Sequence, residues 1–236
     1  MTDSLVQTMA PVVLTEDGER PLTADEQRQY ERDADTWWTA NSLPALGQLT
    51  ADWLEGRCLF LPAYCATGPD PETTDLIPTL AALNRAGLVT DSSQPGHGPV
   101  EGYDGRMWLQ RAYVSGYTDA GTIHSLAAAL AHHDDLILWC RPVKLGARKP
   151  APDRDYFPAT IRENDDTAET GEYDVNTVAG LTPTRRDVKE LYRGELNPAA
   201  IKTLQRAWHV TVADAEYRID GRLWELLAEW AKRRTI

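Results

Sequence analysis

Short strand-like segments alternate with amphipathic helical segments along most of this chain, and this alternation restricts its fold more than any other feature. The clearest helical segment runs from Thr73 to Ala86, where apolar residues recur at spacings of three and four, and Gly87 ends it. A short strand pattern at residues 88–90 follows at once. We therefore predict one α/β domain of short strands alternating with helices, with an α+β arrangement as the alternative.

The same rules assign the rest of the chain. Thr23 is the predicted N-cap of the first helix, because acidic residues follow it early. Helices are predicted over residues 24–38, 43–54, 73–86, 120–132, 184–191, 198–208 and 221–232. Strands are predicted over residues 12–14, 88–90, 107–117, 135–143, 178–181 and 208–212.

The predicted domain boundary lies before residue 24. Residues 1–23 are polar and weakly patterned, and they are expected to form a loosely ordered N-terminal arm apart from one short strand. Residues 24–236 form the predicted domain. Within it, residues 91–105 are predicted to be a loop, and the charged, Pro-rich residues from about 144 to 176 a long excursion.

The charge balance restricts the partners. The chain has 24 Lys and Arg against 36 Asp and Glu, a net charge of −12. No basic stripe is visible, which argues against nucleic acid and against an anionic membrane. No run of about 18 apolar residues suggests a membrane span. A small cationic ligand suits this balance best.

Cysteine usage and the N-terminal segment indicate a compartment. The three cysteines are odd in number and form no C-x-x-C pair, which favours a reducing cytoplasm and argues against a structural zinc site. The first residues are acidic and polar, without the apolar stretch of a signal peptide. We expect a cytoplasmic protein that needs no metal, and a homodimer is compatible with the sequence.

No common catalytic signature occurs in the chain, whether a glycine-rich phosphate loop, G-x-S-x-G or H-E-x-x-H. The run His132-His133-Asp134-Asp135 resembles a metal cluster at first sight. Adjacent residues on a helix point in different directions, so these four side chains cannot all ligate one ion. The favoured interpretation is a polar helix end with histidine near the C-terminal dipole.

The stretch from Asp70 to Pro95 carries the most chemical information. Glu72 and Thr73 open a predicted helix, where unpaired backbone N–H groups can also hold a carboxylate. Thr90 and Ser93 follow that helix on a strand end and loop, a common ligand position in α/β sheets. On spacing alone the alternative is favoured, in which Thr73 only caps the helix and residues 93–95 form a turn.

Four blocks in this order resemble a known family. They are the pair Glu72-Thr73, residues 84–95, residues 104–113 and residues 210–224. The C-terminal regulatory domain of eukaryotic-type methylenetetrahydrofolate reductase carries an E-T pair, then N-R-x-G-(I/L)-L-T-I-N-S-Q-P, then G-G-Y-x-x-Q-K-A-Y, and then L-V-N-L-V-D-N-D-F-x-L-D-x-x-L-W. The last block shares Val210, Asp214, Asp220, Leu223 and Trp224 without a gap. The resemblance covers roughly residues 43–230.

The resemblance implies a ligand, because the domain of that family binds S-adenosylmethionine and inhibits a separate catalytic barrel. The family's contacts carry over as Glu72, Thr73, Thr90 and Ser93, to which we add the neighbours Asp70 and Gln94. Later threonines of the family correspond loosely to residues 176–184, where Thr177 is the nearest candidate. Pro71 before the E-T pair and the excursion at 144–176 depart from the family pattern.

Our first hypothesis is an enzyme that cleaves or cyclises S-adenosylmethionine, since a chain of 236 residues has no room for the reductase barrel. An internal nucleophile can attack the γ-carbon and expel methylthioadenosine. Attack by the α-carbon gives 1-aminocyclopropane-1-carboxylate, and attack by the carboxylate gives homoserine lactone. No lysine lies in a recognisable pyridoxal-phosphate motif, so we predict catalysis without that cofactor. Glu72 is the first candidate base, followed by Tyr113, His97 and Asp214.

The alternative hypothesis is a non-catalytic S-adenosylmethionine sensor that regulates a partner protein. Such a sensor needs an exposed apolar docking surface, which the Trp37-Trp38 pair could supply. Methyl transfer to an acceptor ranks last, because no segment resembles the glycine loop of a methyltransferase.

Overall fold

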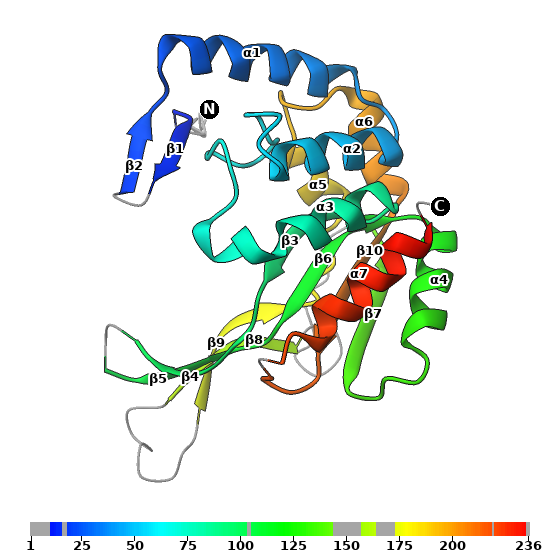
Figure 1. Ribbon diagram of the computed structural model, residues 1–236. Coiled ribbons are helices and arrows are strands. Elements are labelled where there is room, and N and C mark those ends of the chain that lie inside the picture. Colours follow the sequence, from blue (N-terminus) through cyan, green and yellow to red (C-terminus); the bar gives the residue numbers. More distant parts are fainter. Residues whose placement is uncertain are drawn as a thin grey trace, which may run out of the picture.

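The computed structural model describes residues 10–15, 18–102, 105–143, 157–163, 173–218 and 220–234 (Figure 1). Its centre is a four-stranded sheet with the order β3 (Val89–Gln94), β6 (Tyr113–Thr118), β10 (Trp208–Asp214) and β7 (Leu136–Pro142). All three strand pairs are antiparallel. The predicted mixture of helices and strands in one domain is confirmed, and the antiparallel pairing gives the α+β arrangement.

One face of the central sheet forms the main core. Helices α3 (Ile77–Arg85) and α7 (Arg222–Arg234) lie over this face (Figure 1). Alternate strand residues Val114, Val210 and Val212 are fully buried there. Helix α4 (Ala120–Leu130) lies near the edge strand β7, and the Trp230 indole donates a hydrogen bond to Ser125 at 3.0 Å, which ties α7 to α4.

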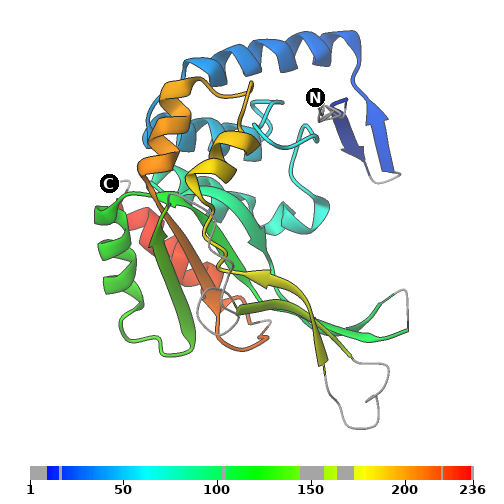
Figure 2. The same cartoon turned by 180° about the vertical axis from the view of Figure 1, so that it is seen from behind.

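The remaining helices lie toward the other side of the sheet. Helices α5 (Arg185–Leu191) and α6 (Pro198–Arg206) are in front of the sheet when the molecule is seen from behind (Figure 2). Helix α1 (Ala24–Thr39) crosses above them, and α2 (Leu43–Leu54) packs against α3 and β3 (Figure 1). Thr23 caps α1 as predicted, in a reciprocal capping box with Glu26.

Two predictions at the N-terminal side need correction. The arm contains a hairpin, β1 (Val12–Thr15) with β2 (Gly18–Pro21), where one strand was expected. Val12 also exchanges backbone hydrogen bonds with the loop at Cys65 and Thr67, at 3.0 and 2.9 Å. The hairpin is thereby attached to the segment that follows α2, so the described part of the arm is not loose.

The predicted helix from Thr73 begins differently in the structure. A 3₁₀ helix, η1 (Pro71–Leu76), precedes α3, and Asp70 takes the N-cap position that Thr73 was expected to hold. Two prolines explain the difference. Pro71 sets the start, since its fixed φ suits a first helical residue. Pro78 lies in the first turn of α3, where its missing N–H costs no helical hydrogen bond, so the α-helix begins at Ile77.

A second sheet projects from the domain (Figure 2). Its order is β4 (His97–Glu101), β5 (Met107–Gln110), β8 (Phe157–Glu163) and β9 (Tyr173–Ala179). The predicted strand 107–117 is therefore two strands in two sheets, and part of the predicted loop 91–105 is strand. Within the predicted excursion, residues 157–163 form β8 and residues 173–176 begin β9, while residues 144–156 and 164–172 lie outside the described residues.

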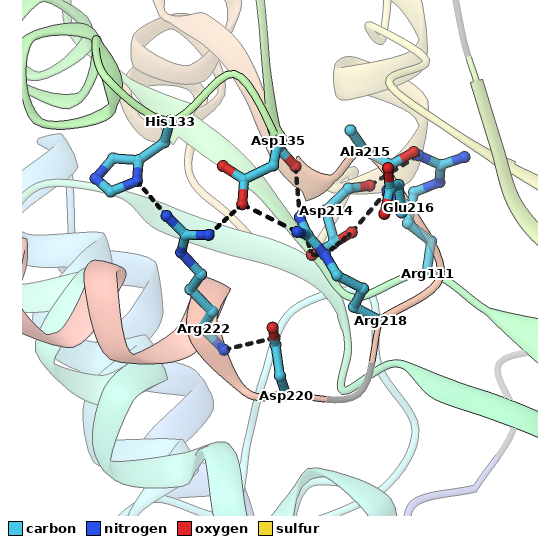
Figure 3. A network of polar contacts seen from close by, with 9 residues as sticks. All are labelled: Arg111, His133, Asp135, Asp214, Ala215, Glu216, Arg218, Asp220 and Arg222. Carbon is cyan, nitrogen blue, oxygen red and sulfur yellow. Dashed lines mark hydrogen bonds and ion pairs between the residues drawn. The ribbon is translucent and has the colours of Figure 1, made fainter.

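Arg111 joins the two sheets where the chain passes from β5 to β6 (Figure 3). Its guanidinium is buried and donates to the carbonyl oxygens of Pro158, Asp214 and Ala215 at 2.9, 2.8 and 2.5 Å. This cation thus satisfies carbonyls from both sheets, which explains the break in the predicted strand. Among the described residues, no helix has the length and apolar character needed to cross a membrane.

Strand β3 lies so close to β6 that no side chain fits at Gly116. A Cβ at Gly116 would lie 2.2 Å from the Val89 carbonyl oxygen. We expect Gly116→Ala to lower the free energy of unfolding by about 1–3 kcal/mol or more, because β3 must move away from β6. Urea unfolding checks this, with Gly68→Ala as the control, since nothing lies within 4 Å of a Cβ there. Equal stabilities of the two variants would contradict the prediction.

Candidate functional site

Two adjoining cavities lie along β3. The larger opens on the face of the sheet opposite α3 and α7, and the smaller, which Leu80 of α3 also lines, lies at the β3 edge of the sheet. The larger chamber, about 650 Å³, lies between this face, residues 61–64, residues 180–184 and helices α1, α2, α5 and α6. The smaller chamber, about 230 Å³, lies between residues 69–73, residues 90–94 and the end of α2. The residues that line both are Thr50, Leu61, Tyr64, Thr90, Asp91 and Ser92. We call the two chambers together the crevice.

The structure brings most of the predicted ligand residues together. The smaller chamber is lined by Asp70, Glu72, Thr73, Thr90, Ser93 and Gln94. Tyr113 lines the larger chamber. The side chain of Thr177, on β9, lies outside the described residues. Six of the predicted positions therefore surround one cavity, although α3 separates η1 from β3 in the sequence.

Two candidate bases lie elsewhere. His97 lines neither chamber, and its Nδ1 lies 2.9 Å from the carbonyl oxygen of Gly98. Asp214 also lines neither chamber, because it ends β10 and pairs with Arg218 at 3.1 Å. The prediction of these residues as candidate bases is not supported, since neither can reach a ligand in the crevice.

A buried asparagine positions β3 at the crevice. The Asn84 carboxamide accepts a hydrogen bond from the Thr90 backbone N–H at 3.0 Å and donates to Thr90 Oγ1 at 2.8 Å. It also donates to the Leu80 carbonyl one turn back in α3 at 2.9 Å. Since Thr90 Oγ1 already accepts from Asn84, its own hydroxyl proton is the group that it can offer a ligand.

Asp91 enters the crevice through an irregularity in β3. The register between β3 and β6 shifts between Thr90 and Ser92, so Asp91 is an extra residue opposite its partner strand. The Asp91 carboxylate accepts a hydrogen bond from Ser115 Oγ at 2.7 Å and pairs with His209 Nε2 at 2.9 Å. His209 is buried, and the Asp91 side chain keeps 22% exposure.

The pair with His209 keeps Asp91 ionised. Burial raises the pKa of the Asp91 carboxyl, but the charge and hydrogen bond of His209 and the Ser115 hydroxyl outweigh this effect. The net pKa is below the usual range. Sequence reasoning missed this pair, because Asp91 and His209 are 118 positions apart and neither belongs to a recognised motif.

Tyrosines supply further polar groups in the crevice. Burial raises the pKa of Tyr64, Tyr113, Tyr117 and Tyr192, so their phenols stay protonated at neutral pH. Tyr113 Oη lies 2.9 Å from Ser92 Oγ. This environment favours Tyr113 as a hydrogen-bond donor over its predicted role as a base.

A threonine that the sequence did not single out faces the larger chamber. Thr182 lines this chamber, and its hydroxyl is buried without a hydrogen-bond partner among the described residues. It lies within residues 176–184, the segment in which Thr177 was chosen. Thr182 faces the chamber because residues 180–184 lie directly before α5 in the lining. The spacing of residues in the sequence does not predict this position.

The crevice is acidic. Four carboxylates line it, those of Asp70, Glu72, Asp91 and Asp187, and the described lining contains no lysine or arginine. Such a lining attracts a cation and disfavours a phosphate group.

The His132–Asp135 run belongs to a different part of the molecule. His133 Nδ1 lies 3.1 Å from an Arg222 nitrogen, and Asp135 pairs with Arg218 and Arg222 at 3.0 and 2.5 Å (Figure 3). No group of three or more potential metal-binding side chains occurs within the described part of the chain. These contacts give the run a structural role at the start of β7.

The fold and the crevice together define a mixed α/β protein with a cavity of the size that small ligands occupy. The chain belongs to the family described as Domain of unknown function (DUF6919), whose model matches residues 32–232. This match includes every crevice residue. A search of curated proteins finds no significant match.

The Asp91–His209 pair predicts an acid-dependent loss of stability. A carboxyl with a lower pKa when folded contributes stability above its unfolded pKa of about 3.9, and the contribution is lost as pH falls through the folded value. We expect Asp91→Asn to be less stable than the wild type by about 1–3 kcal/mol near pH 7, and by less near pH 3. Urea unfolding across this range measures the difference, and a difference independent of pH would contradict the prediction.

Proposed function

We propose that this chain binds S-adenosylmethionine in the crevice and is an enzyme that cleaves or cyclises it with release of methylthioadenosine. One observation carries the proposal. The smaller chamber is lined by the four residues that the resemblance names, Glu72, Thr73, Thr90 and Ser93. The described lining of the crevice is acidic and contains no lysine or arginine.

The two chambers suit the two halves of this ligand. The larger chamber has aromatic and aliphatic walls, including Trp37, Leu46, Tyr117 and Leu181, which suit a purine ring and its ribose. The smaller chamber contains hydroxyls, backbone and carboxylates, which suit an amino acid. Glu72 can pair there with the ligand ammonium, and Thr73 and Ser93 can donate to its carboxylate.

The proposed reaction is intramolecular displacement at the γ-carbon. The bond between the γ-carbon and sulfur breaks, its electron pair goes to sulfur, and neutral methylthioadenosine leaves. If the α-carbon attacks, a base must take its proton, and 1-aminocyclopropane-1-carboxylate forms. If the carboxylate attacks, homoserine lactone forms without that step. The enzyme contributes mainly by holding the folded, near-attack conformer.

Glu72 remains the proposed base, because it lines the smaller chamber beside the expected position of the α-carbon. Lysine, the residue that holds pyridoxal phosphate as a Schiff base, is missing from the described lining of both chambers. This composition supports the proposal of a reaction that does not use pyridoxal phosphate.

The sensor is the second candidate, and exposed apolar side chains favour it. Trp38, Leu181 and Leu191 are 46%, 44% and 54% exposed. The predicted docking pair is reduced to Trp38, since Trp37 is buried and lines the larger chamber. Leu181 and Leu191 also line that chamber, so a ligand there can change the surface that a partner meets.

Incubation with S-adenosylmethionine followed by chromatography separates the two candidates. We expect methylthioadenosine to accumulate over many turnovers, together with a co-product that identifies the attacking atom. Calorimetry on the same preparation measures binding. Binding with complete recovery of intact ligand would leave only the sensor, and the absence of binding would exclude both.

Glu72→Gln tests the proposed base. We expect this variant to bind within about tenfold of the wild-type Kd, a change of up to about 1.4 kcal/mol, and to release methylthioadenosine at least about a hundredfold more slowly. Asp75→Asn is the matched control, because Asp75 lies on the same 3₁₀ helix, is exposed and lines neither chamber. An unchanged rate in Glu72→Gln would remove Glu72 from the mechanism.

A further inference from the structure

Asp91 lies where the two chambers meet. Six residues line both chambers, and Asp91 is the one carboxylate among them. Glu72 and Asp70 line only the smaller chamber, and Asp187 only the larger. A ligand that extends from one chamber into the other must therefore pass the Asp91 side chain.

The chemistry of the proposed ligand places its charge at this junction. In S-adenosylmethionine the sulfonium sulfur is the atom that joins the adenosyl half to the amino-acid half. With the adenosyl half in the larger chamber and the amino-acid half in the smaller, the sulfonium lies next to Asp91. Tyr64, which also lines both chambers, can offer its ring face to the same cation.

The contacts of Asp91 maintain its negative charge without using all of its accepting capacity. Ser115 donates to Oδ1 and His209 approaches Oδ2, and each carboxylate oxygen can accept more than one contact. The Nε2–H of His209 can donate in the neutral ring as well as in the imidazolium. Asp91 can therefore still accept a contact from a cation that lies between the two chambers.

We propose that Asp91, held by His209 and Ser115, recognises the sulfonium and sets the preference of the crevice for the cationic ligand over neutral S-adenosylhomocysteine. This inference rests on the proposed function. Asp91 is a specificity residue that contacts the ligand, and His209 and Ser115 are positioning residues.

The test compares two non-reacting ligands by calorimetry. Sinefungin carries an ammonium group in place of the sulfonium and cannot release methylthioadenosine, while S-adenosylhomocysteine is neutral at sulfur. We expect the wild type to prefer sinefungin by at least about tenfold in Kd. Asp91→Asn should lower this preference to about threefold or less, mainly by weakening sinefungin.

A second variant guards against a folding defect. Asp91→Ile combined with His209→Leu removes the carboxylate and the imidazole together, so that neither is left without the other, and should show the same loss of preference. Circular dichroism and urea unfolding confirm that each variant is folded. His124→Gln is the control, since His124 is exposed on α4 and lines neither chamber, and it should keep the wild-type preference.

The outcomes separate the inference from the proposed function. If the wild type binds neither these ligands nor S-adenosylmethionine, both fail. If the wild type binds both ligands equally, or if a folded variant keeps the preference, the inference is wrong while the proposed function stands. Loss of the preference in both variants, with the control unchanged, supports the assignment of Asp91.

Discussion

The hydrogen bonds of the Asn84 side chain hold the crevice together. Its carboxamide connects the last turn of α3 to the first residues of β3, at Leu80 and Thr90. Helix α2 approaches the same place so closely that a Cβ at Gly47 would lie 2.4 Å from the Asn84 carbonyl oxygen. Because Asn84 is completely buried, water cannot replace these bonds. The positions of Thr90, Asp91 and Ser93 all depend on this connection.

Local patterns in the sequence predicted the limits of the helices better than those of the strands. The capped helices α1 and α2 begin and end within a residue of their predicted limits, because capping and apolar periodicity are local signals. The residue pattern at 107–117 predicted one strand, but the structure divides it at Arg111 into β5 and β6. Its division depends on carbonyl groups of Pro158, Asp214 and Ala215, which are distant in sequence.

The same limit applies to the crevice. The residues around Glu72 and Thr90 were found because they form short ordered motifs. The alternative interpretation, in which Thr73 only caps the helix, is wrong, because Asp70 occupies the N-cap position. Asp91 and His209 could not be found this way, because a bulge in β3 and the pairing of β6 with β10 bring them together. Neither the bulge nor the strand pairing can be recognised from the local sequence pattern.

The two charged networks of the molecule show why residue type alone does not identify a site. At one end of β10, Arg218 and Arg222 neutralise Asp214 and Asp135 (Figure 3). Arg111 satisfies carbonyl groups beside them. Near the other end of β10, His209 pairs with Asp91, which is also in contact with a cavity. The first network is complete in itself, and the second has accepting capacity left for a ligand.

In the proposed function, the acidic lining separates affinity from catalysis. A carboxylate beside the sulfonium stabilises the bound ligand, but the positive charge on sulfur disappears as methylthioadenosine leaves. Asp91 would therefore stabilise the ground state more than the transition state and would not itself accelerate the reaction. The rate would have to come from the smaller chamber, where Glu72, Thr73 and Ser93 orient the amino-acid half. Binding and turnover would thus depend on different carboxylates of one crevice, and a site that only senses the ligand would need the first of them alone.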